Sequence, residues 1–74
     1  MNVSIHIGDV IKNELEENKR SVAWLAEAIF CDPSNLRKTL SKPYLSTDLL
    51  FRISFVLGKD FFACYSQQLV VDSE

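Results

Sequence analysis

The sequence predicts an all-α fold, a compact five-helix bundle that forms a single domain over residues 1–74. Apolar residues recur at intervals of three and four in five successive segments, which is the spacing of one helix face. Residues that cap helices stand at the expected starts of four segments: Ser21, Asp32, Ser46 and Asp60. A chain of 74 residues buries only about 60–65% of its unfolded surface, so one small core is expected. We expect order over about residues 5–69, with residues 70–74 as a loose end.

The first helix is expected from about Ile5 or Ile7 to roughly Asn18, and the second over residues 21–29. The apolar stripe of the first helix consists of Ile7, Val10, Ile11 and Leu15. Its glutamates are expected to face water: Glu14, Glu16 and Glu17. The apolar side of the second helix consists of Val22, Leu25, Ala26 and Ile29. Trp24 lies off this side, so it either lines the edge of the core or is an exposed anchor for a partner.

A tight corner joins the second helix to a third, expected over residues 33–41. Asp32-Pro33 is a favourable start, because Asp accepts hydrogen bonds from the first turn and Pro has no N–H that needs a partner there. Leu36 and Leu40 then share the buried face. Only Phe30-Cys31 separates the two helices, and so short a link forces them to cross. This geometry is that of a helix-turn-helix.

Two further helices are expected over residues 47–57 and from Asp60 to about Leu69. Gly58 is a natural end for the fourth helix. Phe51 and Phe55 lie beside its apolar face, so this helix is apolar almost all round and either is central to the core or contacts a partner. The apolar set of the fifth helix is expected to be Phe61, Phe62, Tyr65 and Leu69.

Charge is divided unevenly along a chain whose formal net charge is −2. Residues 1–18 carry a net charge of −3 and residues 43–74 carry −2, but residues 19–42 carry +3. The basic residues of that stretch are Lys19, Arg20, Arg37, Lys38 and Lys42. Because salt screens charges beyond ~8–10 Å, the local balance decides which face meets a phosphate backbone. The clustering favours a nucleic-acid partner, and chance clustering is the alternative interpretation.

The residues predict neither catalysis nor a metal site nor a bound cofactor. An enzyme needs a positioned nucleophile, an acid–base pair or a metal, and the one histidine, His6, is expected at the surface or as a cap. Cys31 and Cys64 lack metal-ligand spacing and are expected to be reduced and largely buried. No apolar run approaches the ~20 residues of a membrane span, and the first residues are unlike a secretory signal. A cytoplasmic, non-enzymatic protein with no membrane partner is expected.

The region around the corner resembles a known family. Leu25-Ala26 followed by Ile29, then the corner Phe30-Cys31-Asp32, then Leu36 are similar to the helix-turn-helix of Cro/lambda-repressor-like domains, the Xre family. The resemblance covers about residues 5–69, and residues 45–62 resemble the last two helices of short regulators of this kind.

Two places depart from the pattern of that family. Phe30 stands where many members have a glycine with a left-handed backbone, and a larger residue there costs on the order of 1 kcal/mol. Leu40 and Lys42 stand where many members have an acidic residue and a glycine. Neither departure is expected to disrupt the fold.

The resemblance implies a sequence-specific, double-stranded DNA-binding transcriptional regulator of the repressor-like kind, associated with the nucleoid of a prokaryote or with a phage. The helix over residues 33–41 would enter the major groove. Base contacts are then expected from Ser34, Arg37 and Lys38. Phosphate contacts are expected from Ser21, Asn35, Lys42 and Tyr44. A homodimer on a two-fold site is expected, because one short helix reads too few base pairs.

The alternative is a protein-interaction module on the same fold, such as the antitoxin of a toxin–antitoxin pair, with weak or no DNA binding. The acidic total, with a pI of about 5.3, and the aromatic residues of the fourth and fifth helices favour it. The protein partner, such as a toxin, would cover Trp24, Phe51, Phe55 or Tyr65.

Overall fold

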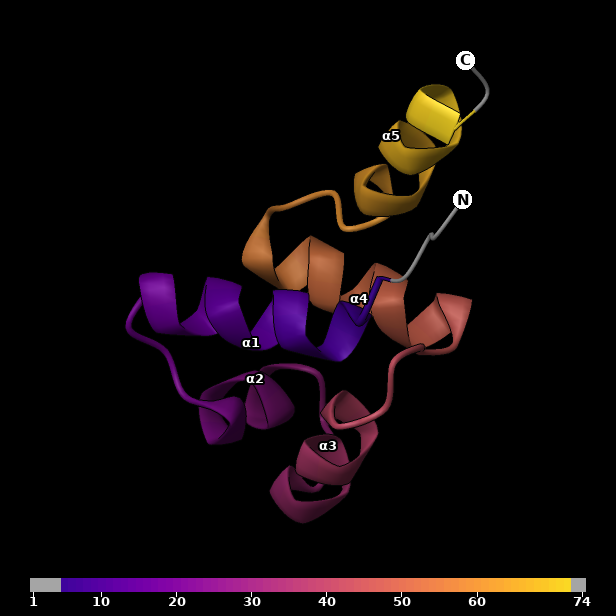
Figure 1. Cartoon of the computed structure of the whole chain (residues 1–74). Helices are drawn as coiled ribbons and strands as arrows, with labels where there is room; N and C mark the ends of the chain where they lie inside the picture. Colours follow the sequence, from indigo (N-terminus) through magenta and orange to yellow (C-terminus); the bar gives the residue numbers. More distant parts are fainter. Residues whose placement is uncertain (1–4, 73–74) are drawn as a thin grey trace.

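The computed structural model describes residues 5–72, and every regular element among them is an α-helix (Figure 1). The helices are α1 (Ile7–Glu17), α2 (Val22–Ala28), α3 (Pro33–Leu40), α4 (Thr47–Leu57) and α5 (Ala63–Asp72). The all-α prediction is confirmed, and the expected ranges of the first four helices agree closely with those found. Residues 1–4 and 73–74, at the two ends of the predicted domain, lie outside the described residues.

Local sequence explains where α2, α3 and α4 begin and where α4 ends. Three N-cap side chains each accept a hydrogen bond from the backbone N–H three residues further on, at 3.0–3.2 Å: Ser21, Asp32 and Ser46. Each bond satisfies an N–H group that has no partner inside the helix. Gly58 ends α4 with a left-handed backbone, at φ of 64°, which a residue without Cβ adopts at little cost. These positions are as predicted.

Helices α1–α4 enclose one hydrophobic core. Its buried side chains are Ile7, Ile11, Leu15, Leu25, Ala26, Ile29, Leu36, Leu40, Leu50, Ile53 and Phe61. No charged or polar side chain is buried among the described residues, so apolar packing holds the core together. Trp24 is half-buried against it, and the Arg20 guanidinium lies 4.5 Å from the centre of the indole ring. Of the two roles predicted for Trp24, packing at the edge of the core fits this position.

The start of α5 differs from the prediction. Asp60 does not cap the helix directly, because its Oδ1 accepts the backbone N–H of Phe62 at 3.0 Å in a turn that precedes the helix. The helix begins only at Ala63. Phe61 is fully buried from within this turn. The aromatic residue that anchors the α4–α5 connection therefore lies outside α5.

The outer part of α5 also differs from the prediction. Tyr65 and Leu69 belong to the predicted apolar set of this helix, and 36% and 70% of their surfaces are exposed. In Figure 1, α5 leads away from the other helices, and among the described residues it packs little against them. The helix continues to Asp72, so the predicted loose end is wrong for residues 70–72.

Within residues 5–72, two residues other than glycine have a left-handed backbone: Lys19, with φ of 57°, and Phe30, with φ of 60°. They lie in the connections before and after α2. For residues with a Cβ this conformation costs roughly 1–2 kcal/mol. The left-handed corner implied by the family resemblance is therefore present at Phe30. The Phe30 side chain is 94% exposed, so packing within the chain offsets little of the cost.

We expect Phe30→Gly to raise the free energy of unfolding by about 0.5–1 kcal/mol, because glycine relieves the left-handed strain and the exposed ring contributes little packing. Urea unfolding of dilute protein measures this change. Lys19→Gly is the matched control, because it relieves the same strain at an exposed polar residue. A loss of stability in Phe30→Gly together with a gain in Lys19→Gly would show that the ring packs within its own chain.

One ion pair joins distant parts of the chain. Lys59 Nζ lies 2.9 Å from Glu14 Oε1, and the Glu14 side chain, predicted to face water, is only 19% exposed. Hydrogen bonds from Lys59 and from the Asn18 side chain hold the pKa of Glu14 below its ordinary value. Glu14 in turn raises the pKa of Lys59. The pair connects the middle of α1 with the turn between α4 and α5.

Folding lowers the pKa of Glu14, which gives this ion pair a defined pH dependence. The pair adds stability above the unfolded pKa of 4.5, and this stability is lost as the pH falls through the folded value. Lys59→Met should therefore lower the urea midpoint more at about pH 7 than at about pH 3. Lys19→Met removes a cation that has no ion-pair partner among the described residues, and it should show no such difference. Equal losses for Lys59→Met at both pH values would contradict the expectation.

Candidate nucleic-acid interface

The exposed side of α3 carries the three residues predicted to contact bases. Ser34, Arg37 and Lys38 are all exposed, whereas Leu36 and Leu40 are buried in the core. The two leucines are four residues apart and share one side of the helix, so their burial turns the other side toward solvent. In Figure 1, α3 lies at the end of the molecule remote from α5.

The residues predicted to contact phosphate are exposed as well, but they belong to two parts of the chain. Asn35 is in α3, and Lys42 and Tyr44 follow in the segment that leads to α4. Ser21 precedes α2, and its hydroxyl oxygen accepts the Trp24 backbone N–H at 3.0 Å, which leaves the O–H able to donate to a phosphate. Over residues 5–72, no hydrogen bond or ion pair connects Ser21 with the α3 residues.

The eight lysines and arginines fall into two groups. Four are engaged within the chain: Lys12 with Asp9 at 3.9 Å, Arg52 with Asp48 at 3.2 Å, Lys59 with Glu14 at 2.9 Å, and Arg20 with the Trp24 ring. In the described part of the chain, no ion pair or hydrogen bond engages the side chains of the other four: Lys19, Arg37, Lys38 and Lys42. Three of these four lie in α3 or directly after it. Uncommitted positive charge is therefore concentrated there.

An acidic residue occupies the N-terminal end of α3. Asp32 Oδ2 accepts the backbone N–H of Asn35 at 3.1 Å. This carboxylate offsets the partial positive charge of the helix start and repels a phosphate there. An anion is therefore expected to bind toward the other end of the helix, near Arg37, Lys38 and Lys42.

The start of α1 holds the C-terminal end of α3. His6 is the N-cap of α1, and its Nδ1 accepts the Asp9 backbone N–H at 3.1 Å. Nε2 therefore carries the proton and donates to the carbonyl oxygen of Ser41 at 3.1 Å. The next residue, Ile7, donates its backbone N–H to the carbonyl of Pro43 at 3.2 Å. Two hydrogen bonds thus connect the N-cap and the first residue of α1 to the segment that follows α3.

Gly8 allows these two segments to come close together. A Cβ at this position would overlap the carbonyl oxygen of Leu40 and would lie 3.0 Å from that of Lys42. Within a helix, alanine is favoured over glycine by about 1 kcal/mol, so a glycine in α1 costs stability unless space requires it. Here space does require it, because the Leu40 carbonyl oxygen occupies the place of a Cβ.

His6 and Gly8 therefore position the candidate interface, although sequence analysis assigned neither of them to it. His6 was expected at the surface or as a cap, and it is indeed a cap. Its bond to Ser41 spans 35 residues, and no local pattern indicates such a bond. Gly8 did carry a signal, because a glycine inside an amphipathic helix is costly and often marks a close approach.

We expect Gly8→Ala to lower the free energy of unfolding by about 1–3 kcal/mol, because the added methyl group displaces the end of α3. Helix propensity alone predicts the opposite sign, a gain of about 1 kcal/mol. Urea unfolding distinguishes the two outcomes. Asn13→Ala, at an exposed position of the same helix, is the control and should be neutral or slightly stabilising. A more stable Gly8→Ala would rule out the close approach.

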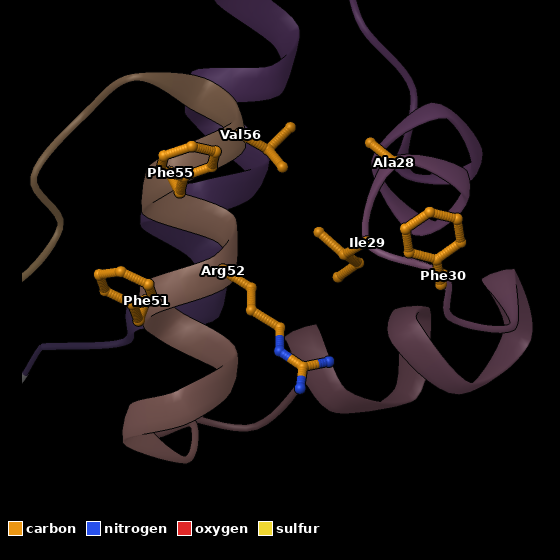
Figure 2. Close-up of a pocket in the computed structure, with 7 residues that line it drawn as sticks. All are labelled: Ala28, Ile29, Phe30, Phe51, Arg52, Phe55 and Val56. Atoms are coloured by element: carbon orange, nitrogen blue, oxygen red, sulfur yellow. The ribbon is translucent and has the colours of Figure 1, made fainter.

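A second surface feature lies between α2 and α4. A hollow of about 310 Å³ opens there, with residues from the end of α2 on one side and residues from α4 on the other (Figure 2). Its lining consists of Ala28, Ile29, Phe30, Phe51, Arg52, Phe55 and Val56. We call Phe30, Phe51 and Phe55 the aromatic surface; they are 94%, 60% and 79% exposed. Apart from Arg52 the lining is apolar, which suits contact with another molecule.

Other kinds of site are not found in the part of the chain that the structure describes. No group of three or more His, Cys, Asp or Glu is placed to hold a metal ion. None of the described helices has the length and apolar character needed to cross a membrane. Cys31 and Cys64 are free and partly exposed. Comparisons of the chain with family models, curated proteins and solved structures found no match.

Proposed function

We propose that this chain is a sequence-specific, double-stranded DNA-binding transcriptional regulator in which α2 and α3 act as a helix-turn-helix of the Cro/lambda-repressor (Xre) type. The proposal rests on one observation, which concerns the ion-pair partners of the basic side chains. The cations elsewhere in the chain are mostly engaged with neighbouring side chains, whereas Arg37, Lys38 and Lys42 have no ion-pair partner within residues 5–72. A phosphate backbone is a partner that suits three such charges.

The dimensions of α3 are compatible with the major groove of DNA. An α-helix with its side chains is about 10–12 Å across, and the major groove is about 12 Å wide. Arg37 can donate two hydrogen bonds to the acceptors of a guanine, and Ser34 and Lys38 can reach neighbouring base edges. Lys42, which follows the helix, is suited to a phosphate.

The proposed regulator acts as a homodimer. One short helix reads only a few base pairs, and two copies related by a two-fold axis read two half-sites about one helical turn apart. The repressor-like role and the location with the nucleoid belong to this proposal through the family resemblance.

DNA binding is expected to weaken steeply with salt. If each of the three cations of a chain releases one counterion from the DNA, a dimer releases six, and affinity should fall by about a thousandfold between about 50 and 200 mM salt. Duplexes selected from a random pool supply the ligand, and fluorescence anisotropy measures binding. Affinity that is flat across this range, or the absence of binding at micromolar protein, would refute the proposal.

Two substitutions are expected to affect this binding in different ways. Arg37→Ala should change the preferred sequence, because it removes about 1–3 kcal/mol of discrimination at one base pair. Lys42→Ala should weaken binding to all duplexes alike. It should also reduce the slope of log affinity against log salt concentration by about one for each phosphate that is no longer neutralised. Lys12→Ala removes the same charge from α1, where Lys12 lies close to Asp9, and serves as the control. An effect of Lys12→Ala equal to that of Lys42→Ala would mean that only net charge matters.

The second candidate function is a protein-interaction module, such as an antitoxin. The exposed aromatic surface favours it, because large apolar patches on small proteins mark interaction sites. The two functions differ in a simple respect: the module would bind no selected duplex, and Arg37→Ala would leave its activity unchanged.

A further inference from the structure

We propose that the aromatic surface binds the same surface of a second copy of this chain, with the two α4 helices packed across a two-fold axis. The biological role of this dimer rests on the proposed function, in which two copies of the chain read two half-sites of DNA. The association itself rests on the shape, charge and area of the surface.

Two features of Phe30 lower the stability of the fold, and contacts within the described chain offset little of this loss. The residue has a left-handed backbone, with φ of 60°, where glycine would be unstrained. Its ring is also 94% exposed to water. A residue that departs from local preference without a gain inside the fold is expected to serve a function. Burial of the ring against another molecule would contribute the free energy that offsets both costs.

The shape of the surface suits a second copy in particular. Phe51 and Phe55 are four residues apart on α4, so they form one ridge of the kind that packs into the groove of a neighbouring helix. The hollow with Phe30 and Ile29 lies on one side of this ridge. A second hollow, also of about 310 Å³ and lined by Gly58 and Phe62, lies on the other side. The surface therefore carries both a ridge and grooves, as a two-fold interface requires.

The charges around the surface allow two copies to meet. Asp48 and Arg52 lie beside the ridge and pair with each other at 3.2 Å, so this part of α4 is neutral. The exposed basic side of α3 and the acidic side of α1 would each repel a second copy of themselves. Of these three surfaces, the aromatic one alone is both apolar and free of net charge. The basic residues of α3 stay outside it and remain available to DNA.

The exposed area of the three phenylalanines is a large part of what a specific dimer needs. With about 200 Å² for one fully exposed phenylalanine, the three rings expose roughly 450 Å². A standard interface buries about 800 Å² on each partner. The aromatic rings alone supply more than half of that area, and the rims of the two hollows supply more.

The test is the oligomeric state of the whole chain without DNA. Sedimentation equilibrium from about 5 to about 500 µM should show a monomer–dimer equilibrium, and Phe55→Asp should raise the dissociation constant at least thirtyfold, roughly the effect of losing one hot-spot residue. Leu69→Asp adds the same charge at an exposed apolar residue of α5, outside the aromatic surface, and should leave the equilibrium unchanged. Circular dichroism checks that both variants fold, as expected for residues that are 79% and 70% exposed.

A second measurement needs no variant. Amide chemical shifts of the wild-type chain, followed by NMR over the same concentrations, should move at Phe30, Phe51 and Phe55 and stay constant at Arg37 and Lys38. Shifts confined to other helices would overturn the proposal, as would a dimer that Phe55→Asp leaves intact. A wild-type chain that stays monomeric throughout would also overturn it, and the surface would then have to face a different protein.

DNA binding is measured separately, so the two proposals can fail independently. A monomer that still binds selected duplexes overturns the dimer surface alone. A dimer that Phe55→Asp dissociates, but that binds no duplex, supports the surface and overturns the proposed function.

Discussion

The contact between the start of α1 and the end of α3 is the constraint on which the arrangement of this small protein depends. Gly8 leaves room for the carbonyl oxygen of Leu40, and the adjacent His6 and Ile7 bond to the segment that follows. With its end held in this way and Leu36 buried, α3 can present only one side to solvent. The side presented is the one that carries the uncommitted cations. A contact made for packing thus also decides which charges an outside molecule can meet.

The protein keeps its two candidate surfaces chemically separate. Basic residues that have no ion-pair partner within residues 5–72 gather on α3 and directly after it. Most of the exposed large apolar residues lie on α4, on α5 and at the corner that precedes α3. Since salt limits the reach of surface charges to ~8–10 Å, an overall charge of −2 does not prevent a local basic region from attracting phosphate. The ion pairs elsewhere sharpen this contrast, because they neutralise cations such as Lys59.

Prediction from the sequence succeeded where the cause is local and failed where it is not. Ser21, Asp32 and Ser46 cap their helices through bonds that span three residues, so the sequence nearby contains all that is needed. The apolar spacing of α5 is equally regular, yet Tyr65 and Leu69 are exposed because α5 packs little against the other described helices. Glu14 lies on a helix side that looked solvated, but it meets Lys59, which is 45 residues away. A periodic pattern indicates which side of a helix can be buried, and it does not indicate whether a neighbour is present.

The sequence by itself determined the all-α class, the positions of four helices and the concentration of basic residues near α3, because helix spacing, caps and charge are properties of short segments. The tertiary structure decided which cations stay unpaired, where α5 leads and which phenylalanines are exposed. It also decided that His6 and Gly8 support α3. Each of these depends on distances between residues that are far apart in the chain, which the packing of the helices sets and no local pattern records.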